Sequence, residues 1–168
     1  MTTPMPKLDN KAFWQYSVSR YATADIAPLA LLLQDNHGMN VNVLLLVCWC
    51  LENNVIINLP QLQAIINATL ESEEKLEVHR AVRKAARPED GIHSAHYETL
   101  KAQELALERE QQNDIVSAFN EQDVTRLPVT GQAGNIFNAS IAALINAYSL
   151  RDNSEARRLM GLVVNQLP

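Results

Sequence analysis

The chain is 168 residues long and is poor in the residues that break or cross-link a fold. Its 5 glycines and 7 prolines are too few for a collagen-like or low-complexity protein. Its 2 cysteines, Cys48 and Cys50, lie on nearly opposite sides if the segment is a helix. They then cannot bridge each other or share a metal ion, so we expect two buried free thiols.

Long apolar runs and targeting signals are missing as well. No apolar run approaches the ~20 residues that span a bilayer, so no membrane association is predicted. Residues 1–7 lack the charged and then apolar layout of a signal peptide. We therefore expect the protein in a reducing cytoplasm.

A strong charge of one sign is also absent, because the formal net charge is only −5. Nucleic acids and anionic membranes are bound through a dense positive field. The composition therefore argues against a nucleic-acid partner, and solubility alone explains the mild acidity.

The alternation of apolar and polar residues that marks a strand is not found, and Val55–Ile57 is too short to build a sheet. Apolar residues at helical spacing run through most of the chain instead. The predicted helices cover about 9–21, 25–37, 40–53, 58–87, 94–120, 135–150 and 154–166. Without a repeat or a long linker, residues 1–168 are predicted to form one all-α domain, a bundle of about seven helices. Residues 1–8 are predicted to be a flexible N-terminus.

Helix ends are marked by residues that satisfy unpaired backbone groups. Gly38 supplies the left-handed residue that closes the second predicted helix. A turn over 88–91 and a loop over 127–134 separate later helices. The predicted N-cap residues are Asp9, Asp25, Asn40 and Asn153.

The segment Leu29–Leu51 contains two dense apolar runs around a polar cluster from Gln34 to Asn42. Helices that are apolar almost all round are stable only inside a larger body. The segment therefore predicts a buried helical hairpin at the centre of the bundle.

The polar cluster is the first candidate site, because it gathers amide, carboxylate and imidazole groups in a short turn. Its candidate ligand-binding residues are Asp35, His37 and Asn42, joined by Tyr16 and Tyr21 from the aromatic first helix. The structural alternative is that most of these groups satisfy buried helix ends, which leaves only Asp35 and His37 without an assigned role.

Glu104 and Glu108 are the second candidate, because they fall on the same helix face as Leu100 and Leu107. Two acids in an apolar stripe need a cation nearby. The 88–91 turn folds the preceding basic helix back, which predicts an ion-pair ladder of Arg83 and Arg87 with Glu104 and Glu108. The alternative is that both faces are solvated.

Motifs of other site types are missing. There is no Glu-x-x-His pair for a di-iron site and no phosphate-binding loop, so neither a metal nor a cofactor is predicted. The basic segment 79–87 is preceded by acidic residues, an order that complements the helix dipole.

The chain resembles a family of short uncharacterised bacterial proteins, seen mainly in gammaproteobacteria. The resemblance rests on Phe13-Trp14-Gln-Tyr16-Ser17, on Leu33-Gln34-Asp35-Asn-His37-Gly38-Met-Asn-Val41-Asn42-Val-Leu44-Leu45 and on Glu104-Leu105-Ala-Leu-Glu108. It covers most of the first 110 residues. The family is a domain of unknown function, so it implies a bacterial cytosolic setting and no activity.

Three functions are consistent with these patterns. The first is a non-catalytic cytosolic interaction module that binds a protein partner or a second copy through the aromatic helix or the charged hairpin. The second is a ligand-binding protein or enzyme with a pocket near residues 34–42. The third is an RNA-binding accessory that uses the basic helix 79–87.

Overall fold

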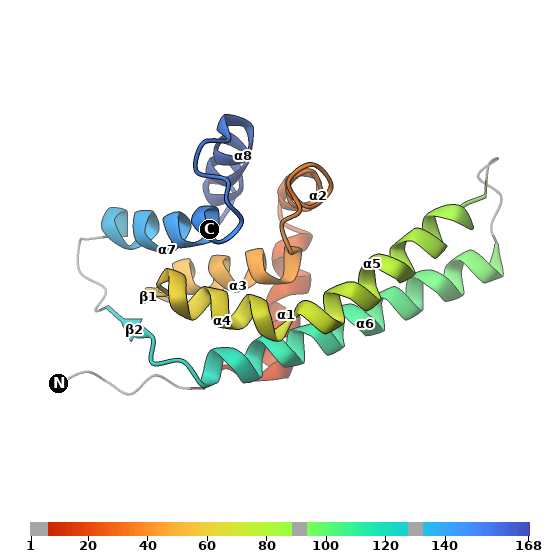
Figure 1. Cartoon of the computed structure of the whole chain (residues 1–168), viewed down its shortest axis with the longest axis horizontal. Helices are drawn as coiled ribbons and strands as arrows, with labels where there is room; N and C mark the ends of the chain where they lie inside the picture. The colour runs from red at the N-terminus through yellow and green to blue at the C-terminus, as the bar shows by residue number, and fades with distance from the viewer. Residues whose placement is uncertain (1–6, 89–93, 128–132) are drawn as a thin grey trace.

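The computed structural model describes residues 7–88, 94–127 and 133–168, with the backbone alone for 133–138. Eight α-helices and one pair of two-residue strands lie within this part (Figure 1), which confirms the predicted all-α class. Most of the predicted 88–91 turn and 127–134 loop lies outside the described residues. The elements are α1 (Asn10–Tyr21), α2 (Ile26–His37), α3 (Val41–Glu52), β1 (Val55–Ile56), α4 (Leu59–Ala68), α5 (Leu70–Ala85), α6 (Ala95–Asn120), β2 (Thr125–Arg126), α7 (Ala133–Ala147) and α8 (Ser154–Asn165).

Two elements differ from the prediction. The helix expected over 58–87 is two helices, α4 and α5, which meet at Thr69. The Thr69 Oγ1 donates a hydrogen bond to the Ile66 carbonyl at 2.7 Å at this junction. Strand β1 pairs antiparallel with β2, and Val55 lies opposite Arg126. A two-residue strand is too short to show alternation in the sequence, which is why this pairing was not predicted.

Helix α3 lies in the middle of the body and contacts α1, α2, α6 and α7 (Figure 1). Nine of its twelve residues are buried, which agrees with the predicted central position. Helix α2 buries only one face, since Leu31 and Leu32 are 43% and 44% exposed. The expectation that both helices of the hairpin are enclosed therefore holds for α3 and fails for the outer face of α2.

The helix caps follow the sequence with one exception. Asp9, Asn40 and Asn153 each accept a backbone hydrogen bond at the start of a helix. Gly38 closes α2 with φ of 68°. Asp25 occupies the N-cap position of α2 but makes no capping hydrogen bond through its side chain, so that predicted role is wrong.

The N-terminal boundary also differs from the prediction. Leu8 is buried at 6% exposure, and its backbone exchanges two hydrogen bonds with the Asn120 side chain, both at 2.9 Å. The chain is therefore fixed to the end of α6 from Leu8 onward. Residues 1–6 of the predicted flexible segment lie outside the described residues.

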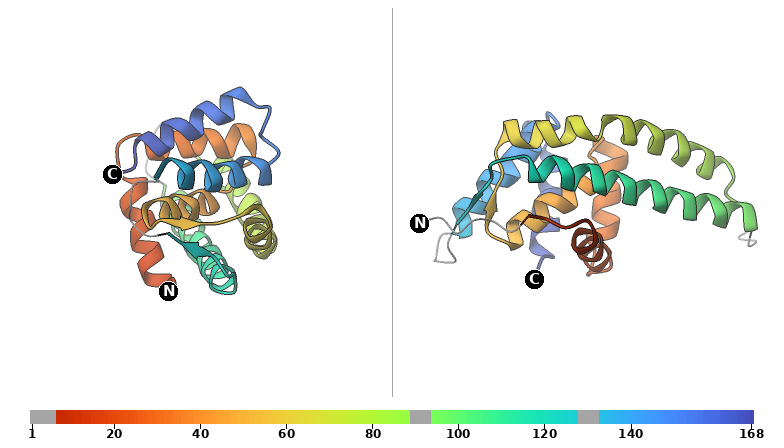
Figure 2. Two further views of the ribbon diagram at one scale, coloured as in Figure 1. Left: turned by 90° about the vertical axis from the view of Figure 1, so that its left-hand side faces the viewer. Right: turned by 90° about the horizontal axis from the view of Figure 1, so that it is seen from below.

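Helices α5 and α6 form a long antiparallel hairpin whose far half extends past the other helices (Figure 2). The two helices are joined there by a 2.7 Å hydrogen bond between the His79 ring Nε2 and the Leu100 carbonyl. One side of this hairpin faces α1 and α2, and that arrangement creates the space described below.

The two thiols behave as predicted. Cys48 and Cys50 are free and buried in α3, and burial raises the pKa of the Cys48 thiol to about 12. None of the described helices combines the length and apolar content needed to cross a membrane.

The position of α3 predicts unequal costs for two leucine substitutions. Leu44→Ala, at a fully buried site in α3, should lower the free energy of unfolding by about 2–5 kcal/mol. Leu31→Ala, on the exposed face of α2, should cost less than about 1 kcal/mol. Urea unfolding followed by circular dichroism measures both, and equal losses would contradict a central α3 with a peripheral α2.

Candidate binding cleft

A cleft of about 630 Å³ separates α1, α2 and the start of α3 from the α5–α6 hairpin. It brings together five of the predicted site residues, which come from both candidate sites: Tyr21, Asn42, Arg83, Glu104 and Glu108. The described residues that line it are Trp14, Ser17, Val18, Tyr21, Ala22, Leu31, Gln34, Val41, Asn42, Leu45, Arg80, Arg83, Glu104, Leu105, Glu108 and Gln112.

The mouth of the cleft is apolar. Val18, Leu31 and Leu105 line it and remain 54%, 43% and 54% exposed. Trp14 and Tyr21 add aromatic rings beside them, and the Arg109 guanidinium stacks 5.2 Å from the centre of the Trp14 ring. We call Trp14, Val18, Tyr21, Leu31 and Leu105 the apolar rim. It leaves several large side chains from three helices without cover.

The wall formed by the hairpin carries an ion-pair cluster of Glu73, Arg80, Arg83, Glu104 and Glu108. Arg80 lies 3.1 Å from Glu73, 3.7 Å from Glu104 and 3.8 Å from Glu108. Arg83 Nε lies 2.9 Å from Glu104 Oε2. The two arginines are thus shared among three carboxylates, with the shortest distances to Glu73 and Glu104.

The contacts differ in register from the predicted ladder. Arg83 does lie against Glu104, but Arg80 rather than Arg87 approaches Glu108. In the part of the chain that the structure describes, Arg87 makes no ion pair with either glutamate. In an antiparallel hairpin the predicted ladder would place Arg87 opposite Glu104 and Arg83 opposite Glu108. The observed partners are Arg83 and Arg80, so the ladder is displaced by about one turn along α5 toward the body.

A chain of buried side-chain amides continues inward from this cluster, and we call Ser17, Asn42, Gln111 and Gln112 the amide chain. Gln111 Nε2 donates to Glu73 Oε2 at 2.9 Å. Asn42 Nδ2 donates to Gln111 Oε1 at 2.9 Å, and Gln112 Nε2 donates to Asn42 Oδ1 at 3.0 Å. Gln112 Nε2 also donates to Ser17 Oγ at 2.8 Å. The amide chain therefore links α1, α3 and α6 to Glu73 of α5 through buried groups that are hydrogen-bonded to one another, with Gln112 Oε1 left unpaired within the described chain.

Electrostatics single out Glu108 in the cleft. Burial raises the pKa of its carboxyl group, and the neighbouring Glu104 adds to the rise, while Arg80 opposes both. Burial also raises the pKa of the Tyr21 hydroxyl, with a contribution from Glu108. A raised pKa means that the surroundings in the cleft stabilise the ionised carboxylate less than water does.

Tyr16, one of the other predicted site residues, lies outside the cleft lining. Its hydroxyl donates to Glu52, which also forms a two-point ion pair with Arg20 at 2.8 and 2.7 Å. Tyr16 therefore joins α1 to the end of α3.

His37 and Asp35 also lie outside the cleft lining. The ring Nδ1 of His37 is 3.3 Å from Asn153 Nδ2, which joins α2 to the start of α8. The buried Nε2 lies 3.5 Å from Glu155 Oε1 but makes no hydrogen bond within the described chain. Asp35 is exposed. Of the polar cluster from Gln34 to Asn42, the residues Gln34 and Asn42 line the cleft, whereas Asp35 and His37 do not.

Glu73, Gln111 and Gln112 are among the residues of this site that were not singled out from the sequence. Glu73 belongs to the acidic residues before the basic segment 79–87, whose order was explained by the helix dipole. The two glutamines follow Leu107 and precede Ile115 on a helix with an apolar stripe. Adjacent glutamines within such a stripe are buried and therefore require polar partners from other helices. Their position in the stripe was the feature from which a buried polar site could have been predicted.

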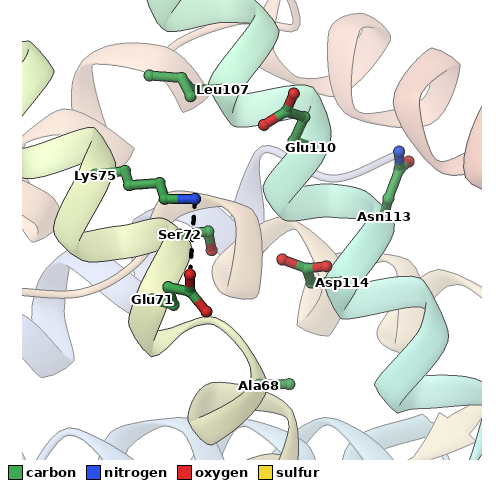
Figure 3. Close-up of a pocket in the computed structure, with 8 residues that line it drawn as sticks. All are labelled: Ala68, Glu71, Ser72, Lys75, Leu107, Glu110, Asn113 and Asp114. Carbon is green, nitrogen blue, oxygen red and sulfur yellow. Dashed lines mark ion pairs between the residues drawn. The ribbon is translucent and has the colours of Figure 1, made fainter.

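A second groove of about 460 Å³ lies between the α4–α5 junction and α6. Glu71 and Lys75 from α5 face Glu110 and Asp114 from α6 across it (Figure 3). The Lys75–Glu71 ion pair at 3.7 Å joins neighbouring turns of one helix. In the described ranges, no group of three or more histidine, cysteine or acidic side chains is arranged to hold a metal ion.

Comparison with known proteins gives one match. The family described as "Protein of unknown function (DUF2390)" matches residues 12–115. No curated protein and no solved structure matches the chain. Every described residue that lines the cleft lies within the matched segment.

The unequal pairing of the two glutamates predicts opposite effects on stability. Glu104→Gln removes the 2.9 Å partner of Arg83 and should lower the free energy of unfolding by about 1–3 kcal/mol. Glu108→Gln should raise the melting temperature at pH 7, because it removes a carboxylate whose pKa is raised by folding.

The pH dependence provides the control for this prediction. An acid with a raised folded-state pKa contributes stability that is complete below its unfolded pKa and is lost as the pH rises through its folded pKa. The advantage of Glu108→Gln should therefore disappear as the pH falls toward 4. Glu110→Gln, on an exposed part of the same helix, is the matched control. Melting curves of the three variants at both pH values give the measurement. Destabilisation by Glu108→Gln at pH 7 would mean that Glu108 is fully paired.

Proposed function

We propose that this chain, which belongs to the DUF2390 family of proteins of unknown function, is a non-catalytic interaction module. Its cleft holds an apolar segment of a protein partner. The observation that carries the proposal is the apolar rim, which leaves Val18, Leu31 and Leu105 between 43% and 54% exposed around a cleft of about 630 Å³. Exposed apolar side chains gathered at one concave site are typical of protein-binding surfaces.

The exposure of the rim favours a protein segment over a small ligand. A volume of about 630 Å³ suits a small molecule as well. Such a molecule would fill the cleft and leave the outer faces of Val18, Leu31 and Leu105 in water. A partner segment that lies across the mouth covers them. Their apolar surface is then removed from water, which favours binding.

The polar groups of the cleft support binding rather than catalysis. The described lining contains no histidine or cysteine, and its serine, Ser17, accepts a hydrogen bond from Gln112. A nucleophile needs a base within hydrogen-bond reach, and an amide nitrogen is not a base. Arg80 and Arg83 are occupied by carboxylates.

The same ion pairs weigh against the RNA-binding alternative. Arg80 has a side chain only 12% exposed and lies within 4 Å of three carboxylates. An arginine held in this way is not free to neutralise a phosphate. A cytoplasmic location is part of the proposal, and the two free thiols of α3 are consistent with it.

Selection from a random twelve-residue peptide library on the purified chain tests the proposal. We expect enrichment of peptides with two or more large apolar residues. Leu31→Asp and Leu105→Asp should each weaken their binding at least about tenfold, because a buried charge would then oppose apolar contact. Fluorescence anisotropy of labelled peptides measures the affinities.

Val78→Asp is the matched control, since Val78 is 63% exposed on α5 and does not line the cleft. This variant should bind like the unmodified chain. Failure to enrich any peptide, or equal binding by Leu31→Asp, would contradict the proposal. A dimer in sedimentation experiments that Leu31→Asp and Leu105→Asp dissociate would identify a second copy of the chain as the occupant.

A further inference from the structure

The orientations of the amides next to the cleft are fixed by one carboxylate. Glu73 Oε2 can only accept a hydrogen bond when ionised, so the end of Gln111 that faces it at 2.9 Å is the nitrogen. The oxygen of Gln111 then receives Asn42 Nδ2 at 2.9 Å. Asn42 therefore turns its oxygen toward Gln112, whose Nε2 donates to it at 3.0 Å.

This order leaves Gln112 Oε1 as an acceptor without a donor. The residue is only 1% exposed, and its Oε1 is buried and makes no hydrogen bond within the described chain. Rotating the amide does not help, because its oxygen would then face Asn42 Oδ1, which cannot donate, even though the Ser17 hydroxyl can. A buried acceptor without a donor has lost its hydrogen bond to water and gained none in return. Gln112 borders the cleft, where an incoming donor can pair with it.

Two further acceptors lie along the same stripe of α6. Glu104, Glu108 and Gln112 are spaced four residues apart, so they share one helix face, and all three line the cleft. Glu104 Oε1 is buried and accepts no hydrogen bond, although Arg80 Nε is 3.7 Å away. Arg83 Nε lies 2.9 Å from Glu104 Oε2, an ion pair without hydrogen-bond geometry.

The charges of the ion-pair cluster do not balance. Glu73, Glu104 and Glu108 carry three negative charges, whereas Arg80 and Arg83 carry two positive charges. Among the described residues Glu108 is the carboxylate left over, since its ion pair with Arg80 is at 3.8 Å and its side chain is 34% exposed. Within the described chain this cluster is therefore short of one cation, and two buried oxygens beside the cleft, Glu104 Oε1 and Gln112 Oε1, have no donor.

From these contacts we propose that the partner segment places a lysine or arginine side chain on the Glu104–Glu108–Gln112 stripe of α6, with apolar neighbours on the rim. This inference rests on the proposed function and adds the chemistry that the partner must carry. A cationic side chain supplies both the missing charge and donors for the unpaired oxygens. Its aliphatic stem would pass between rim residues such as Leu31 and Leu105.

A matched pair of peptides tests this chemistry. An enriched peptide with a central lysine is compared with the same peptide carrying norleucine, which keeps the stem and removes the charge. Loss of the charge should weaken binding to the unmodified chain by about tenfold or more. Glu108→Gln should weaken the lysine peptide by a similar factor and leave the norleucine peptide unaffected.

Glu110→Gln is the control, because it removes the same charge from the same helix but from the side that lines the second groove. It should bind both peptides like the unmodified chain. Enriched peptides without lysine or arginine, or an equal loss for both peptides with Glu108→Gln, would overturn the inference and leave the interaction module standing. If no peptide is enriched, both proposals fail.

Hexylammonium chloride distinguishes the source of the cation. It carries the same charge and a similar stem, but it cannot cover the rim. We expect it to compete with the lysine peptide only at concentrations at least a hundredfold higher. Displacement at equal concentration, with the same dependence on Glu108, would assign the cleft to a free amine and overturn the peptide assignment.

Discussion

The structure depends on the amide chain that runs from Glu73 to Ser17 through the interior. Uncharged amides are costly to bury without partners, and among the described residues of the amide chain only Gln112 Oε1 lacks one, so the amide chain tolerates little displacement of the helices that provide it. Gln111 and Gln112 of α6 reach Glu73 of α5, Asn42 of α3 and Ser17 of α1. The packing of α3 gives the bundle its apolar centre. The amide chain sets how the α5–α6 hairpin stands beside α1, and the cleft is the space that results.

Much of the fold could be predicted because its signals are local. The caps at Asp9, Asn40 and Asn153, and the glycine end of α2, depend on residues within one turn of each other. The break at Thr69 was missed, because threonine is tolerated inside a helix and the apolar pattern continues past it. The exposed face of α2 was missed for another reason. Apolar content shows that a surface needs cover, but it does not show whether this chain or a partner provides it.

The site could be predicted only in pieces. Tyr21 and Asn42 were predicted as part of one site and the charged hairpin as another, and nothing local indicates that the two border one cleft. The position of Arg87 in the predicted ladder was wrong by about one turn, because the register of two helices is decided by packing along their whole length. His37, which had no assigned structural role, proves to join α2 to α8. Asn42, which had such a role, also borders the cleft.

Helix α2 forms one wall of the cleft and is held, through His37, by residues at the start of α8. All described lining residues lie within the family segment 12–115, whereas Asn153 and Glu155 lie beyond it. Helix α2 carries Leu31 on one side and rests on α8 at its end. The residues that support this wall of the cleft and the residues that line the cleft therefore lie in different parts of the chain, the first beyond the family segment and the second within it.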